Sequence, residues 1–182
     1  MGDLVPDKDG ISAAVVFVDM ARELNDIGCT VRTLLQTIQQ KYGNFVSYNS
    51  YLLSHDGNIT NNIFNRLRKA GPQGGYFDSC GGVKIKSIKD VTFGYDSSDI
   101  NGKSDLPMTS TSHMIMYEFE NGCSVTLRTS GTEPKIKFYT EIAGNPLESR
   151  SKEDLEIVLK SFVDVVVQEM LQPTLNKLIP SI

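Results

Sequence analysis

Hydrophobic side chains recur at helical spacing through the first part of the chain. An apolar run over residues 13–18 follows Asp9 and Ser12, either of which could cap a helix, and polarity then rises towards Gly28. Because aspartate and serine favour helix starts and glycine favours helix ends, the pattern predicts a helix that Gly28 terminates. The segment Ala13–Val18 is apolar on almost every side, so we expect it to be buried on several sides.

A second helix is predicted directly after the first. Thr30 is a suitable cap and Gly43 a suitable end, and the apolar residues between them share one face: Val31, Leu34, Leu35, Ile38 and Tyr42. The pattern then changes, because aromatic and aliphatic residues crowd into Phe45–Leu53, which is typical of a strand. Asp56-Gly57 indicates a turn, and Ile59–Ala70 is predicted to form a third helix.

Strands and polar loops follow in the middle of the chain. A strand region is predicted from Val83 towards Phe93, and the polar segment Tyr95–Pro107 is expected to be an exposed loop. The clearest local signal is a hairpin, in which Met114–Glu120 and Cys123–Leu127 alternate in polarity around the two-residue turn Asn121-Gly122.

The last part of the chain predicts one more strand and a long helix. Lys135–Ile142 alternates in polarity, and Ser151 precedes an amphipathic segment that Pro173 ends. Consecutive strands with tight connections imply an antiparallel sheet, and its apolar side needs helices to cover it. We therefore predict an α+β fold, an antiparallel sheet with helices on one face, preceded by two helices that belong to something else. The predicted boundary separates residues 1–43 from residues 44–182.

Composition narrows the class of protein. The 182 residues are 40% hydrophobic and 22% charged, which is typical of a folded globular chain. The net charge of −4 argues against a nucleic-acid partner, because such binding needs a basic surface. No apolar stretch is long enough to span a membrane, and the acidic N-terminus does not resemble a secretory signal. Together with three widely spaced cysteines, which fit neither a disulfide framework nor a zinc site, this predicts a cytoplasmic protein without a membrane partner.

Candidate chemistry is concentrated between the last two predicted strands of the sheet. Arg128 offers a fixed fork of donors for phosphate oxygens, Gly131 can adopt a positive φ that turns amides inwards, and the hydroxyl groups nearby can donate. Within residues 128–137 three cations face a single carboxylate, in a chain that is acidic as a whole. The candidate phosphate-binding residues are Arg128, Thr129, Ser130, Gly131, Thr132, Lys135 and Lys137. An ordinary polar turn with charges on its solvent face is the alternative interpretation.

The other motifs in the sequence give weaker evidence for a functional site. An EF-hand that began at Asp7 would need glycine at its sixth position and glutamate at its twelfth, where this chain has Ser12 and Val18. We therefore interpret the segment Asp7–Gly10 as helix capping. His55 and His113 have no histidine or cysteine at ligand spacing and are expected to be surface or packing residues. Ser79-Cys80 has no activating base nearby in the sequence. We therefore predict no catalytic residue and no metal ligand in this chain.

The segment RTSGTEPKIKFYTE, residues 128–141, resembles the phosphate-binding loop of the C-terminal domain of the α-D-phosphohexomutases. The resemblance extends to DKDGISAA at residues 7–14, to GYDSS at residues 94–98 and to the hairpin, and so covers nearly the whole chain. These details are most similar to the branch that contains eukaryotic phosphoglucomutase/phosphopentomutase and glucose 1,6-bisphosphate synthase.

The resemblance implies a particular place within a four-domain enzyme. In that family a phosphoserine of the first domain transfers its phosphoryl group, the second domain holds Mg²⁺, and a loop of the third domain binds the sugar. The fourth domain has a fold like that of the TATA-binding protein and grips the phosphate that is not transferred. Residues 1–43 would be the last helices of the third domain, and residues 44–182 would be the fourth domain.

What the chain lacks also bears on its function. It contains no loop resembling those that carry the family's serine nucleophile, metal ligands or paired glutamates. The resemblance therefore implies a fragment that is inactive alone and binds no cofactor itself, while the parent enzyme would use Mg²⁺ and a sugar bisphosphate. The expected partners are a sugar phosphate and the missing N-terminal domains.

Two other readings compete with this one. The chain could be a free-standing module that binds a phosphate ligand without catalysis. It could also use its topology to bind nucleic acid, although the net charge of −4 and the lack of interleaved basic and aromatic residues argue against this reading.

Overall fold

The computed structural model describes residues 9–146 and 150–181. The chain divides into two compact units, Met1–Gly43 and Asn44–Ile182. Asp7 and Lys8, the first residues of the DKDGISAA segment, lie outside the described residues. Within the described ranges, none of the helices combines the length and the apolar character that a membrane span requires.

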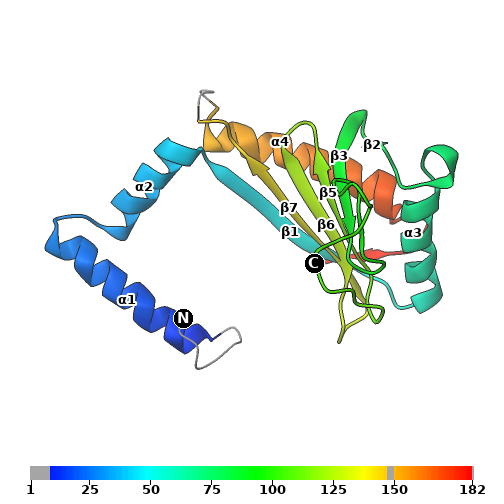
Figure 1. The fold of residues 1–182 in the computed structure, drawn as a ribbon, viewed down its shortest axis with the longest axis horizontal. Helices are drawn as coiled ribbons and strands as arrows, with labels where there is room; N and C mark the ends of the chain where they lie inside the picture. Colours follow the sequence, from blue (N-terminus) through cyan, green and yellow to red (C-terminus); the bar gives the residue numbers. More distant parts are fainter. Residues whose placement is uncertain (1–8, 147–149, 182) are drawn as a thin grey trace. The chain divides into compact units, whose positions relative to one another are not determined.

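Two helices form the first unit, α1 (Gly10–Asp26) and α2 (Val31–Tyr42) (Figure 1). Asp9 caps α1, because its carboxylate accepts a hydrogen bond from the Ile11 amide at 2.9 Å. The Thr30 hydroxyl caps α2 by accepting from an amide of the first turn. Both predicted helices are therefore confirmed.

The apolar run of α1 is exposed in this chain. Neither α1 nor α2 contains a buried residue. The side chains of Val15, Val16, Phe17 and Val18 are 53–64% exposed. The first unit therefore does not bury this run, contrary to the expectation, because α1 and α2 provide no covering partner for it within the described residues of that unit.

An antiparallel sheet forms the framework of the second unit. Its long strands are β1 (Phe45–Leu53), β3 (Val83–Asp90), β5 (Met114–Phe119), β6 (Cys123–Thr129) and β7 (Lys135–Ala143). Three short strands extend it: β2 (Ser79–Cys80), β4 (Tyr95–Asp96) and β8 (Ile179–Pro180). The strand order is β2-β3-β5-β6-β7-β1-β8, with β4 paired to β3, and every pairing is antiparallel. The predicted α+β class and the antiparallel sheet are therefore confirmed.

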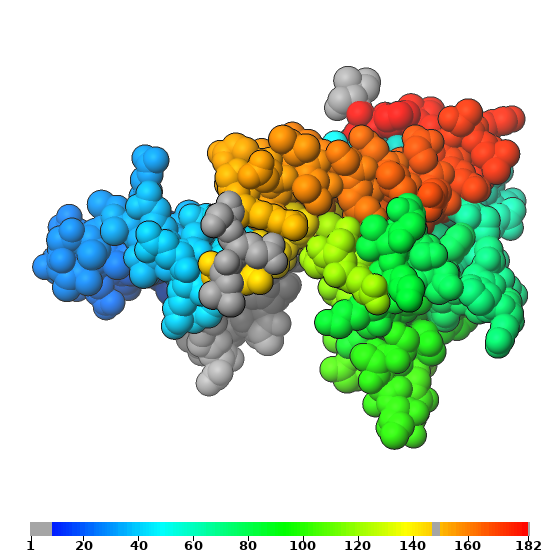
Figure 2. Space-filling view, turned by 90° about the horizontal axis from the view of Figure 1, so that it is seen from above, coloured from blue at the N-terminus to red at the C-terminus, as the bar shows by residue number. Residues whose placement is uncertain are grey.

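Helices cover one face of this sheet. They are α3 (Gly57–Lys69), which is followed by a short 3₁₀ turn at Pro72–Gly74, and α4 (Lys152–Val166), which continues as a π-helical turn, η2 (Val167–Leu171). In Figure 1 α4 runs across the back of the strands, and it packs on β1 and β7. Figure 2 shows α4, in orange, along one edge of the second unit, while the green segment that follows β4 projects from the opposite edge.

Alternation along the strands decides which side chains face the helices. In β7 the buried positions are Ile136, Phe138, Thr140 and Ile142, and the positions between them are exposed or half-buried. The buried residues join those of α3 and α4 in one hydrophobic core. Lys135 and Lys137 consequently lie on the face of the sheet that the helices leave open.

Two local predictions need correction. Asp56-Gly57 is not a turn, because the Asp56 carboxylate accepts from the Asn58 amide at 2.8 Å and so caps α3. The segment Tyr95–Pro107 is not uniformly exposed, because its first two residues form β4, and Asp96 and Ser104 are buried. The Asp96 carboxylate organises this loop by accepting from both the amide and the hydroxyl of Ser98.

Candidate functional site

The loop between β6 and β7, residues 130–134, is held by backbone hydrogen bonds. The Ser130 amide donates to the Lys135 carbonyl at 2.9 Å, and the Lys135 amide donates to the Glu133 carbonyl at 2.7 Å. The Ser54 amide donates to the Pro134 carbonyl at 2.8 Å, which attaches the loop to the end of β1. These bonds make the loop part of the sheet's edge.

Arg128 and Lys137 lie directly opposite each other on β6 and β7. Both are half-buried on the open face of the sheet. Neither forms an ion pair with a carboxylate among the residues that the structure describes. The hydrogen bond found for the Arg128 side chain runs from Nε to the Thr129 carbonyl at 3.4 Å. Because like charges opposite each other destabilise a sheet, this pair favours the approach of an anion.

Lys135 differs from these two cations. Its Nζ lies 2.8 Å from Glu133 Oε1 and 4.2 Å from the centre of the Tyr51 ring. The hydrogen bond with Glu133 raises the pKa of Lys135, and the same contact lowers the pKa of Glu133. The charge of Lys135 is therefore already balanced by a neighbour.

A pocket of about 420 Å³ opens beside the loop. Its walls come from the end of β1, from the first turns of α3, from residues 110–113 and from the loop itself. Polar side chains dominate the lining, which includes Ser54, Thr60, Asn61, Ser112, His113, Thr129, Ser130 and Lys135. Such a lining suits a hydroxyl-rich or anionic ligand.

The structure distributes the candidate phosphate-binding residues over three places. Thr129, Ser130 and Lys135 line the pocket, whereas Arg128 and Lys137 occupy the open face of the sheet. Gly131 and Thr132 lie at the exposed tip of the loop. Gly131 could adopt a positive φ, but it does not do so in this structure, since it is absent from the positive-φ glycines of the described residues. A Cβ atom built on Gly131 would meet no atom within 4 Å, so backbone geometry alone does not require glycine there.

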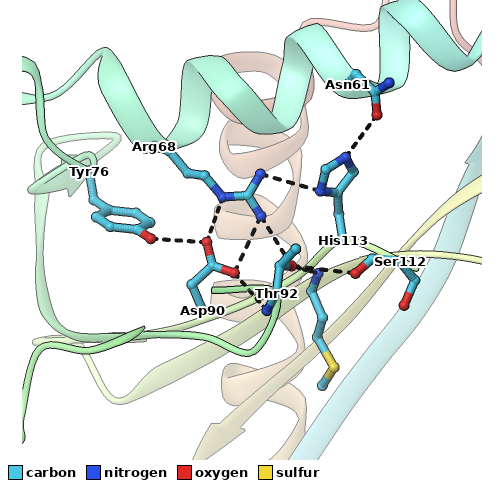
Figure 3. Close-up of polar contacts among 8 residues, drawn as sticks. Asn61, Arg68, Tyr76, Asp90, Thr92, Ser112 and His113 are labelled. Atoms are coloured by element: carbon cyan, nitrogen blue, oxygen red, sulfur yellow. Dashed lines mark hydrogen bonds and ion pairs between the residues drawn. The ribbon is translucent and has the colours of Figure 1, made fainter. Parts of the chain in front are cut away.

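His113 makes polar contacts in addition to the packing contact expected from the sequence. Its ring stacks on Phe64 at 4.6 Å between centres, so the expectation of a packing residue is correct in part. Its Nε2 also lies 2.9 Å from Asn61 Oδ1, and its Nδ1 lies 3.3 Å from a terminal nitrogen of Arg68 (Figure 3). Burial and the Arg68 charge lower the pKa of His113.

Sequence reasoning missed this cluster, because its members come from separated segments. Asn61 and Arg68 lie on α3, whereas His113 precedes β5. The run of hydroxyl residues from Thr109 to Ser112 was the one signal in the sequence that could have pointed to the pocket. Within the described residues, no group of three or more histidine, cysteine, aspartate or glutamate side chains could hold a metal ion.

Comparison with known proteins relates the chain to a family of enzymes. No family model matches the chain. The chain is 44% identical over 178 residues to glucose 1,6-bisphosphate synthase of Homo sapiens, covering 98% of this chain and 28% of that protein. It is 37% identical over 176 residues to phosphopentomutase of Homo sapiens, covering 97% and 29%. It is also 37% identical over 158 residues to a probable phosphoribomutase of Schizosaccharomyces pombe, covering 86% and 27%.

A solved structure agrees at the level of the fold. The exocytosis-sensitive phosphoprotein pp63/parafusin of Paramecium, a phosphoglucomutase in an open form, matches with a TM-score of 0.56 and 18% identity. The match covers 92% of this chain and 28% of that protein. The relatives confirm the resemblance found in the sequence, so the chain belongs to the α-D-phosphohexomutase superfamily and corresponds to its C-terminal domain. It spans about 28% of the length of the first relatives.

Proposed function

We propose that this chain is the phosphate-gripping part of a phosphoglucomutase/phosphopentomutase-like enzyme. Residues 1–43 would be the last helices of the third domain, and residues 44–182 would be the fourth domain. The whole enzyme would move a phosphoryl group between two positions of a sugar phosphate, through a sugar bisphosphate. This chain would hold the phosphate that is not being transferred. A cytoplasmic location remains a prediction.

The pairing of Arg128 with Lys137 carries the proposal. Two cations on neighbouring strands, without a carboxylate partner among the described residues, offer charge to an anion that reaches the open face. The hydroxyl groups of Ser130 and Thr132 lie next to them in the chain and can donate further hydrogen bonds. The guanidinium group suits a phosphate best, because its donors match two phosphate oxygens at once.

Holding a distant phosphate can assist catalysis without taking part in bond breaking. Binding energy from a part of the substrate that does not react can orient the part that does. Phosphoryl transfer also needs a nucleophile and neutralisation of charge, usually with Mg²⁺. The described residues offer no cluster for a metal ion, so those functions would belong to the other domains. We therefore propose that the chain by itself has no mutase activity.

The test of binding is an NMR titration of the ¹⁵N-labelled chain with glucose 1-phosphate. We expect shifts confined to the amides of residues 128–137. A hydrogen bond to a charged group contributes about 1.5–3 kcal/mol, so Arg128→Ala should weaken binding by roughly 10- to 100-fold. Arg128→Lys should bind with intermediate affinity, because it keeps the charge and loses the fork.

A matched control separates a specific site from general charge. Arg32→Ala removes the same side chain from an exposed position of α2 and should leave binding unchanged. Equal affinity of the wild-type and Arg128→Ala chains would contradict the proposed role. Conversion of glucose 1-phosphate to glucose 6-phosphate by the purified chain would contradict the proposed absence of activity.

A further inference from the structure

Residue His113 is tied through its backbone to the start of the phosphate loop. The Thr129 amide donates to the His113 carbonyl at 2.9 Å, and the His113 amide donates to Thr129 Oγ1 at 3.0 Å. Thr129 is the last residue of β6, and Ser130 follows it directly. Any displacement of His113 would therefore move the point from which the loop begins.

Three side chains of α3 hold the imidazole ring. Phe64 stacks on it. Asn61 bonds to Nε2, and Arg68 bonds to Nδ1 (Figure 3). These residues recur at intervals of three or four, so they share one face of the helix. The ring is thus fixed by packing on one side and by hydrogen bonds at both nitrogens.

Arg68 is itself immobilised by a buried network. Its Nε lies 2.5 Å from Asp90 Oδ2, and the Asp90 side chain is fully buried. The Asp90 carboxylate also accepts from the Tyr76 hydroxyl and from the Thr92 amide, both at 3.0 Å (Figure 3). The arginine therefore presents a rigid donor to His113.

Thr92 connects the same network to the residues on either side of His113. Its hydroxyl oxygen accepts from Arg68 at 3.2 Å and from the Met114 amide at 2.9 Å. It donates to the Ser112 carbonyl at 3.4 Å. The backbone is consequently held at both neighbours of His113 in the chain, Ser112 and Met114.

The hydrogen bonds define the protonation state of the ring. Arginine can only donate, so Nδ1 of His113 must accept from Arg68. Nε2 therefore carries the proton and donates to Asn61 Oδ1. Protonation of Nδ1 would abolish the hydrogen bond from Arg68. Two cationic donors would then face each other at the distance of 3.3 Å that now separates Arg68 from Nδ1.

We propose that His113 is a positioning residue that holds the phosphate loop in its binding geometry only while its imidazole is neutral. The inference rests on the proposed function for its consequence, because the loop is the proposed phosphate grip. On protonation the ring loses Arg68 as its partner, Thr129 loses its fixed neighbour, and affinity for an anion at the loop falls.

Several charged groups surround this ring. Arg68 of α3 disfavours the protonated form, and Asp90 of β3 favours it to a smaller extent. His55, Glu133 and Lys135 line the same pocket. With burial added, the net effect is a lowered pKa, so the loosening occurs at a pH below the ordinary value for histidine, about 6.5.

The experiment measures sulfate binding to the full chain by NMR between about pH 5 and pH 8, where sulfate keeps its double charge and histidine titrates. The ring carbon signals of His113 report its own midpoint in the same samples. We expect the sulfate dissociation constant to rise about five- to tenfold as pH falls through that midpoint, which corresponds to about one lost hydrogen bond. Constant affinity through the His113 midpoint would overturn the proposal.

Variants identify the titrating group. His113→Asn keeps an acceptor for Arg68 and cannot titrate, so the pH step should disappear while binding persists. His113→Phe keeps the stacking and loses both ring hydrogen bonds, so it should bind weakly at every pH. His55→Asn is the matched control and should keep the step. A pH step in binding that survives in His113→Asn would contradict the proposal. If that variant does not fold, the comparison of the binding midpoint with the His113 midpoint in the wild-type chain decides.

A second readout does not depend on binding. Exchange of the Thr129 amide, relative to the Val125 amide on the same strand, should accelerate when His113 is protonated. If sulfate causes no shifts at any pH, the proposed phosphate grip fails, and exchange alone then decides on the positioning role. An exchange ratio that does not change across the His113 midpoint would refute it.

Discussion

Removing Arg68 from the buried network should destabilise the second unit strongly. Arg68 is 8% exposed and Asp90 is fully buried, with hydrogen bonds joining them at 2.5 and 3.3 Å. Arg68→Met keeps much of the aliphatic volume and leaves the carboxylate without its cation. The Tyr76 hydroxyl and the Thr92 amide would remain as its partners.

The burial of the pair sets the size of the effect. Removing one partner of a buried ion pair costs about 3–5 kcal/mol, because the remaining charge is left without compensation. We therefore expect a loss of about 4 kcal/mol, which corresponds to a fall in Tm of roughly 8–16 °C for a chain of this size.

Urea unfolding of the wild-type chain and of Arg68→Met at pH 7 tests the reasoning. The double variant Arg68→Met/Asp90→Asn should recover about half of the loss, since no buried charge remains. Lys69→Met, at the next and exposed position of α3, should change stability by less than about 0.5 kcal/mol. A loss below about 1 kcal/mol in Arg68→Met would refute the claim that the pair is buried and tightly coupled.

Further predictions concern the loop, a helix cap and the thiols. Gly131→Ala should leave the Tm unchanged, because a Cβ atom at this position meets open space. The same substitution should weaken glucose 1-phosphate binding if the phosphate approaches the backbone there. Unchanged affinity in the NMR titration would argue against such an approach. Ser151→Ala removes one half of a capping box and should cost about 1 kcal/mol in urea unfolding, so an unaltered midpoint would count against the cap. Iodoacetamide should modify the half-buried Cys29 first, because burial raises the pKa of Cys80 to about 12 and of Cys123 to about 11, which disfavours their reactive thiolates. Equal labelling of all three cysteines in mass spectrometry would contradict this order.

Much of the local structure could be predicted from the sequence. The hairpin turn at Asn121-Gly122 follows from a glycine that adopts φ +82°, and the start of α4 follows from the reciprocal bonds of Ser151 and Asp154. In both cases the residues that determine the conformation lie within a few positions of one another. The facing of Arg128 and Lys137 was predictable in the same way, because a short loop joins their strands.

The sheet order depended on contacts that no local pattern contains. β1 pairs with β7 along its whole length, and Phe45 lies opposite Ala143 although almost a hundred positions separate them in the chain. Loop closure over such a distance has no local signature, and burial of one apolar face selects the register. The two-residue strands β2, β4 and β8 are likewise too short to produce a periodic pattern.

The sequence by itself determined the helices, the long strands, the two faces of the sheet and the cationic character of the loop, because strand alternation, helix periodicity and caps act over a few residues. Only the tertiary structure decided that His113 is held between Asn61, Phe64 and Arg68, and that Thr129 is anchored to it. The same packing divided the candidate phosphate-binding residues among a pocket, the open face of the sheet and the exposed tip of the loop. These arrangements arise where the core forces distant segments together, and a buried charge such as Asp90 then has to find its partners there.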